Sequence, residues 1–236
     1  MRRAYRIDML VSRQSDAGME EAEPGPRNGL PNGPRARTGR LMLETAIRLM
    51  QSGATPSVSE VAEAAGVSRA TAYRYFPSQA ALVGAVVDEG LGPILTWTSG
   101  SQDPARRVAE LIDTGLPRIE AFEATFKAAL KLSLDQWARG RAGTLGEEPE
   151  FKRGHRIELL RDALSPLKGK LGPKKIDRLA QALSLVFGVE VLTVLKDIWG
   201  LDGQETQSVA QWAASALVRA ALEEDADTKP KAAKPA

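Results

Sequence analysis

The sequence predicts an all-α protein, and three observations lead to this fold class. From Arg40 onward apolar residues recur at helical spacing, whereas the strict alternation typical of a half-buried strand is absent. Glycine and proline separate these amphipathic stretches. Hydrophobic residues make up 43% and charged residues 26% of the 236 residues, so the chain is neither disordered throughout nor embedded in a membrane.

The first 37 residues show little periodic structure. Prolines and glycines interrupt the chain repeatedly between residues 24 and 34, and we expect an unstructured basic arm over residues 1–37. The stretch 24–40 carries four arginines and no acid, so it attracts phosphates although the net charge of the chain is only +2. These arginines are Arg27, Arg35, Arg37 and Arg40.

Short helices are predicted over residues 38–91, which we expect to form the first domain. An initial apolar stripe ends near Gly53, and Gly66 permits a sharp turn further along the chain. Hydroxyl side chains can cap the helices that follow the first one. The capping candidates are Ser57 or Ser59, then Ser68, then Ser78.

A second helical domain is predicted over residues 92–225, followed by a disordered Lys/Pro/Ala tail over 226–236. Its first long helix opens at Asp103-Pro104, a favourable cap followed by proline at the first helical position. The other expected helices cover about 150–164, 174–199 and 204–224. The helix 174–199 is apolar on two faces, so both faces must be buried, one in its own domain and one against a partner. We therefore expect a homodimer through helices 174–199 and 204–224.

The segment 57–76 predicts a helix-turn-helix. Ala62 and Ala65 are small where two short helices would cross, and Gly66 suits the tight turn between them. One face of the second helix is polar, basic and aromatic, and no acid occurs from Val67 to Val87. This is the character expected of a helix that enters the major groove of DNA.

A family resemblance is carried by Val61, Ala62, Ala65, Gly66, Val67, Ser68, Thr71, Tyr73, Tyr75, Phe76 and Ser78. At this spacing they closely resemble the DNA-binding signature of TetR-family repressors, over about residues 40–90. The resemblance implies a helical ligand-binding and dimerisation domain behind the DNA-binding domain. It also implies a transcriptional repressor that binds a palindromic operator in double-stranded DNA as a homodimer, and that a small-molecule inducer releases.

Resemblance and chemistry together suggest how DNA would be held. The hydroxyls of Ser57 and Ser68 would bind phosphates, and Tyr73 would reach a phosphate or a thymine methyl. Arg69 and Arg74 would reach guanine edges. The expected DNA-binding residues are Arg37, Arg40, Ser57, Ser59, Ser68, Arg69, Ala70, Thr71, Tyr73, Arg74, Tyr75 and Gln79.

Three positions leave alternatives open or depart from the family pattern. Tyr75 can either pack in the core or contact DNA, and the arginine arm can either solubilise the chain or follow the phosphates. Gln79 stands where a lysine commonly binds phosphate, so one charge-assisted contact is lost. Ala70 and Ala72 replace the usual glycine and leucine without disturbing a helix.

An inducer pocket is expected between helices of the second domain. Its candidate walls and polar groups are Trp97, Phe122, Phe126, Trp137, Ser133, Gln136 and Glu190. Plain core packing of the aromatic residues and a partnered role for Glu190 are the alternatives. The sequence does not indicate the chemistry of the effector.

Several function classes are disfavoured. The chain has no cysteine and a single histidine, His155, which has no acidic neighbour in sequence, so we expect no metal, no cofactor and no catalytic activity. The Lys168–Lys175 loop lacks phosphate-loop spacing. No apolar run could span a bilayer and no signal peptide precedes the arm, so we expect a cytoplasmic protein. A DNA-architectural or division-associated protein without an inducer remains the alternative function.

Overall fold

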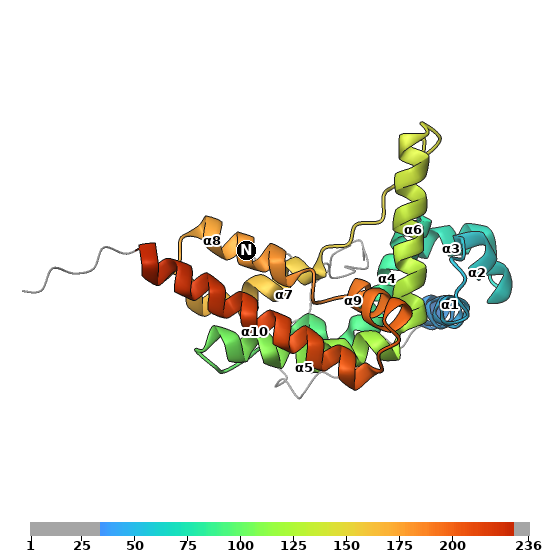
Figure 1. Ribbon diagram of the computed structural model, residues 1–236. Helices are drawn as coiled ribbons and strands as arrows, with labels where there is room; N and C mark the ends of the chain where they lie inside the picture. The colour runs from blue at the N-terminus through green and yellow to red at the C-terminus, as the bar shows by residue number, and fades with distance from the viewer. Residues whose placement is uncertain (1–33, 229–236) are drawn as a thin grey trace, which may run out of the picture.

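Helices follow one another along the chain with no strand between them in the computed structural model, which describes residues 34–228 (Figure 1). This confirms the all-α fold class. The helices of the first half are α1 (Pro34–Gln51), α2 (Val58–Ala64), α3 (Arg69–Tyr75), α4 (Gln79–Leu91), the 3₁₀ helix η1 (Gly92–Thr96), α5 (Pro104–Ala121) and α6 (Glu123–Arg141). Those of the second half are α7 (His155–Ala163), the 3₁₀ helix η2 (Ser165–Leu167), α8 (Pro173–Leu183), α9 (Val189–Leu192), the π-helical segment η3 (Thr193–Ile198) and α10 (Gly203–Thr228).

Both predicted irregular ends overlap with helix. Helix α1 begins at Pro34, so Arg35 and Arg37 lie on a helix and not in an arm. Helix α10 continues to Thr228, beyond the predicted end near residue 224. The rest of the arm, with Arg27, and the rest of the tail lie outside the described residues.

Serine side chains start the three helices α2, α3 and α4, as predicted. Ser57 Oγ accepts from the Glu60 amide at 3.2 Å, and the Glu60 carboxylate accepts from the Ser57 amide at 2.6 Å, which completes a capping box. Ser68 and Ser78 cap α3 and α4 in the same manner. Such caps stabilise a short helix by about 1 kcal/mol each, which matters for helices of only two turns.

The helix-turn-helix and α4 share a core with α1. Gly66 has φ of +66° in the turn between α2 and α3, a conformation that side chains with a Cβ rarely adopt. The fully or nearly fully buried residues of this core include Met42, Ala46, Met50, Val58, Val61, Ala62, Ala72, Phe76, Leu82, Val83 and Val86. Helix α6 adds Ala128, Ala129 and Leu132 to the same core.

Helix α6 therefore belongs to both parts of the molecule. Its first half packs against α1 and α4, while its C-terminal half extends away from the other helices (Figure 1). Trp137 lies on this extension and is 68% exposed. Trp137 therefore does not line a pocket as expected, because no other helix in the described part of the chain covers the end of α6.

The second core is built by α5, α7, α8 and α10. Helix α10 runs alongside α5 and also contacts α8 (Figure 1). Its buried stripe repeats at every fourth residue, through Thr206, Ala210, Ala214 and Val218. The small side chains of this stripe let α10 approach α5 closely.

The predicted single helix over 174–199 is wrong, because the chain turns between α8 and α9. Gly188 has φ of +136°, and a Cβ there would lie 2.4 Å from the Arg156 guanidinium. The preceding Phe187 is buried, and its ring lies against Gly115, where a Cβ would come within 2.5 Å of it. The turn places Phe187 in the core and leaves room for the Arg156 side chain. Periodicity did not predict the turn, because apolar residues continue on both sides of it.

The described residues include no helix that is long and apolar enough to cross a membrane.

Candidate DNA-binding surface and effector cavity

Helix α3 presents the predicted reading face to solvent. Ser68, Arg69, Ala70, Tyr73 and Arg74 are all exposed. Its opposite side is anchored through Ala72, which is fully buried in the domain core. The helix can therefore be inserted into a groove without unpacking the domain.

The predicted polar residues of α2 and α3 lie side by side. The hydroxyl oxygens of Ser59 and Tyr73 are 3.4 Å apart, which joins the first turn of α2 to the exposed face of α3. Thr71 is half-buried, and its hydroxyl accepts from Ser68 Oγ at 2.9 Å. The structure thus brings these predicted residues together on one surface.

Tyr75 connects α3 to the start of α1. Its hydroxyl donates to the Arg35 carbonyl at 2.8 Å, and its ring faces Gly39, where a Cβ would lie 3.3 Å from the ring. Of the two alternatives for Tyr75, the structure favours packing. The side chain fixes the first turns of α1 beside the reading helix.

The first turns of α1 carry a concentration of positive charge. Arg35, Arg37 and Arg40 are exposed and form no ion pair within residues 34–228. Arg37 and Arg40 are three positions apart on the helix, where like charges repel each other and reduce its stability. A nearby phosphate would offset this cost, so the placement suits a phosphate-binding surface.

Gln79 has a role that the sequence did not reveal. Its Nε2 donates to the carbonyls of Thr55 at 2.9 Å and Pro56 at 3.1 Å. The amide therefore ties the start of α4 to the loop that leads into α2, and no longer offers its donors to a phosphate. Gln79 thereby holds the loop that precedes Ser57, and its own contact with DNA stays a prediction.

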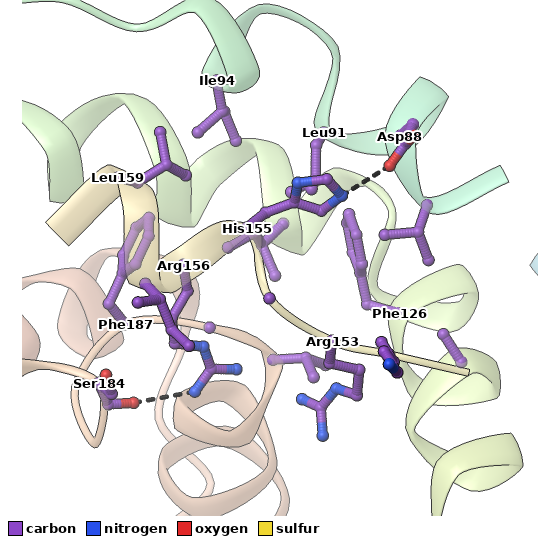
Figure 2. A pocket seen from close by; sticks show the side chains of 18 of the residues that line it. Asp88, Leu91, Ile94, Phe126, Arg153, His155, Arg156, Leu159, Ser184 and Phe187 are labelled. Carbon is purple, nitrogen blue, oxygen red and sulfur yellow. Dashed lines mark hydrogen bonds and ion pairs between the residues drawn. The ribbon is translucent and has the colours of Figure 1, made fainter. Parts of the chain in front are cut away.

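A cavity of about 360 Å³ lies between the DNA-binding helices and the second core (Figure 2). This volume is within the usual range of small-molecule sites. Its walls come from α4, η1, α5, α6, the 151–154 segment, α7, the 184–188 turn and α9. Figure 2 shows Asp88 and His155 on one side of the site, and Arg153 and Arg156 on another. The apolar lining residues include Leu91, Ile94, Ile119, Phe126, Leu159 and Phe187.

His155 and Asp88 join α7 to α4 at the edge of the cavity (Figure 2). His155 Nε2 lies 2.7 Å from Asp88 Oδ1, and both side chains are about 30% exposed. The hydrogen bond to Asp88 raises the pKa of His155 above its usual value, against the opposing effect of burial. His155 has no acidic neighbour in sequence, and its acidic partner comes from a different helix.

Glu190 is held between two arginines. Arg153 donates to Glu190 Oε1, and Arg156 donates to Glu190 Oε2 at 2.5 Å. Partial burial acts to raise the pKa of the Glu190 carboxyl, but the charge of Arg156 and the donor from Arg153 outweigh it, so the pKa lies below its usual value. Glu190 is therefore an ionised, partnered residue that also lines the cavity.

Phe126 and Glu190 are the predicted pocket residues that the structure places in the cavity lining. The others lie elsewhere. Phe122 is half-buried under the Arg118 guanidinium, 4.3 Å from its ring centre, and Ser133 is half-buried on α6. The remaining predicted wall residues are Trp97, which lies under Arg107, and the exposed Trp137.

Gln136 supports the cavity from behind. Its side chain is 3% exposed, and its oxygen accepts from the Phe151 amide at 2.7 Å while its nitrogen donates to the Pro149 carbonyl at 3.1 Å. It thereby holds the segment that precedes α7 against α6. The oxygen and nitrogen of the Gln136 side chain are occupied by these bonds and do not point a free polar group at a ligand.

Sequence reasoning missed Asp88, Leu91, Arg153, Arg156 and Phe187 as cavity residues. They come from α4, the 151–154 segment, α7 and the 184–188 turn, and no local pattern connects these segments. The described part of the chain holds no group of three or more His, Cys, Asp or Glu residues arranged to bind a metal ion.

Comparisons with known proteins agree with this architecture. Residues 42–86 match the sequence model of the bacterial regulatory proteins of the tetR family. A TetR transcriptional regulator from Rhodococcus sp. RHA1 has 19% identity and a TM-score of 0.53, with 79% of this chain and 97% of that chain covered. A tetR-family transcriptional regulator from Streptomyces coelicolor has 15% identity and a TM-score of 0.55, with 83% and 91% covered.

The two structural likenesses show that the fold is shared. A comparison with curated protein sequences gives no match. The family match falls on the segment whose caps, turn and exposed α3 face are described above. Residues 42–86 therefore form a helix-turn-helix DNA-binding domain of the kind found in bacterial regulatory proteins of the tetR family, and the chain shares the fold of the two solved regulators.

Proposed function

We propose that the protein is a ligand-responsive repressor that acts in the cytoplasm. In this proposal it binds a palindromic operator as a homodimer, and a small-molecule inducer releases it. The observation that carries the proposal is the position of α4. Leu82 and Val86 of α4 are buried in the core of the DNA-binding domain, while Asp88 and Leu91 of the same helix line the cavity. A ligand in the cavity therefore contacts the helix that supports the helix-turn-helix.

On the DNA, α3 lies in the major groove. Arg69 and Arg74 have no ion-pair partner within the described residues, so both guanidinium groups are available to guanine edges. Tyr73 and the hydroxyls at the first turns of α2 and α3 contact phosphates, and the arginines at the start of α1 follow the adjacent backbone.

The homodimer buries the second apolar faces of the C-terminal elements. Ile198, Trp199 and Trp212 are each 73% exposed, and Val209 is 39% exposed. Large apolar side chains at such exposure are typical of a surface that a partner covers. A two-fold symmetric pair would present two reading helices to a palindrome.

The switch is a shift in the population of dimer geometries. The inducer binds more tightly to a form in which α4 is displaced and the two reading helices are wrongly spaced for the operator. A cavity in contact with α4 supports this function over the DNA-architectural alternative, which needs no effector site.

The DNA-reading step is tested with Arg69→Ala and an operator obtained by selection from random DNA. The affinity for the operator should fall by roughly tenfold or more, since a bidentate guanine contact contributes about 1–3 kcal/mol of discrimination, while the affinity for random DNA should change little. The matched control is Arg106→Ala, which removes an exposed arginine that pairs with Glu110 far from α3. Equal losses on both DNAs would contradict the assignment of Arg69.

The dimer is tested by sedimentation of the full chain at micromolar concentration. The wild type should sediment as a dimer, and Trp212→Arg should shift it toward monomer because a charge would be buried in the interface. Leu134→Arg serves as the control, because this side chain is also exposed but lies on α6. A wild-type monomer would contradict the proposed homodimer.

A further inference from the structure

Two arginines at the charged end of the cavity face one carboxylate. Arg153 and Arg156 both donate to Glu190, and Lys152, which also lines the cavity, forms no ion pair within residues 34–228. Positive charge therefore exceeds negative charge at this end. The side chains of Arg153 and Arg156 are 28% and 27% exposed, so their charge is partly shielded from solvent.

Arg156 is held in place by the surrounding backbone. Its Nη1 donates to the Ser184 carbonyl at 2.9 Å (Figure 2). Its guanidinium occupies the space beside Gly188 that any other residue's Cβ would fill. The guanidinium is thus positioned before a ligand arrives, which lowers the entropy cost of binding.

Arg153 is less constrained. Among the described residues, its guanidinium donates to Glu190 and to no other side chain. A carboxylate that enters the cavity could take the place of Glu190 on Arg153 while Arg156 keeps its bond to Glu190. An arginine fork binds a carboxylate through two parallel hydrogen bonds, which a neutral hydroxyl cannot reproduce.

The rest of the cavity is apolar. Buried side chains from several segments form this part, so an apolar group of a ligand there would lose contact with water. A ligand must therefore combine an apolar body with a single charged group at one end. These apolar residues are Leu91, Ile94, Ile119, Phe126, Leu159, Phe187 and Val189.

We propose that the cavity binds an amphipathic monocarboxylate, with its carboxylate on Arg153, beside Arg156, and its apolar body among the buried residues. The proposal rests on the proposed function in taking this cavity as the effector site. The excess of positive charge favours an anion, and Glu190, which stays bound to Arg156, would repel a second negative charge.

The test measures binding of matched ligands to the full-length protein by titration calorimetry. The probes are decanoate with decanol and decyltrimethylammonium, and 4-phenylbutyrate with 4-phenylbutanol, so each apolar body carries different head groups. At least one carboxylate should bind roughly tenfold or more tightly than its alcohol, as expected for a charge-assisted hydrogen bond, and the ammonium compound should bind most weakly.

The variant Arg153→Gln should remove most of this preference and leave the affinity for the alcohol unchanged. The matched control is Arg161→Gln, which removes an arginine of α7 that pairs with Asp177 and lies outside the cavity lining. Melting temperatures of both variants establish that they are folded.

Three results would overturn the proposal. They are no binding by either carboxylate, equal binding by carboxylate and alcohol, and an unchanged preference in Arg153→Gln. The repressor function is tested apart from this by adding the bound carboxylate to the operator complex. If the carboxylate binds with the expected preference but the complex is unaffected, the ligand class stands and the inducer role fails.

Discussion

Arg107 is the side chain whose removal tests the packing of the effector domain most sharply. It lies on α5, is 8% exposed, and forms no ion pair within residues 34–228. Its Nε donates to the Ala163 carbonyl at 3.0 Å and its Nη2 to the Asp162 carbonyl at 2.9 Å, at the end of α7. Its Nη1 donates to the carbonyls of Ser99 at 2.6 Å and Ser101 at 3.2 Å, in the loop before α5.

The cost of Arg107→Ala follows from these four bonds. A hydrogen bond from a charged donor contributes about 1.5–3 kcal/mol, but water can reach part of the loop once the side chain is gone, so the terms do not sum. We expect a loss of about 3–5 kcal/mol in the free energy of unfolding, which is a large part of the total for a domain. Arg107→Lys keeps the charge but not the planar fork, and should lose about 2 kcal/mol.

The assay is urea denaturation of the full chain followed by circular dichroism. Arg106→Ala is the control, because the neighbouring Arg106 is 71% exposed and pairs only with Glu110 on the same helix. Its loss should be no more than about 0.5 kcal/mol. The reasoning is refuted if Arg107→Ala lies within about 1 kcal/mol of the wild type, or if the lysine variant is as stable as the wild type.

Three further predictions concern the places where distant helices meet. Gly115→Ala should lower the free energy of unfolding by about 1–3 kcal/mol, because the new methyl group would overlap the ring of Phe187. Unchanged stability in urea denaturation would show that this contact does not fix the 184–188 turn. Tyr75→Phe should lose about 0.5–1.5 kcal/mol through its hydrogen bond to α1 but keep the preference for operator over random DNA; a lost preference in a binding assay would make Tyr75 a reading residue. The raised pKa of His155 means that its pairing with Asp88 stabilises the fold fully below about pH 6.5, and that this contribution is lost as the pH rises through the raised value. Unfolding at pH 6 and pH 8.5 should therefore show a larger loss in the wild type than in His155→Gln, and equal losses would disprove the linkage.

The helix-turn-helix was predictable because its signals are local. Ser57 and Ser68 each bond to an amide three residues away, and the turn depends on the conformational freedom of Gly66 alone. The exposed face of α3 follows from helical periodicity once Ala72 is known to be buried. A short segment of sequence therefore contains most of the information for this part of the site.

The cavity was not predictable in the same way. His155 and Asp88 are 67 positions apart and meet only because α7 packs beside α4. The turn at Gly188 interrupts an apolar pattern that continues on both sides, so periodicity predicted one long helix where there are two elements. Trp137 is apolar and would be expected in a core, but no other helix of the described chain covers the end of α6.

The central claim is that the two α3 helices of a dimer bind the two halves of a palindromic DNA site. Selection of bound sequences from random DNA tests this claim most directly. The wild-type protein should enrich a two-fold symmetric sequence whose half-sites are about one helical turn apart or a multiple of it. Arg69→Ala, selected under the same conditions, should bind DNA but enrich no common sequence. Enrichment of no sequence by the wild type, of a single unsymmetric site, or of the same palindrome by Arg69→Ala would contradict the account.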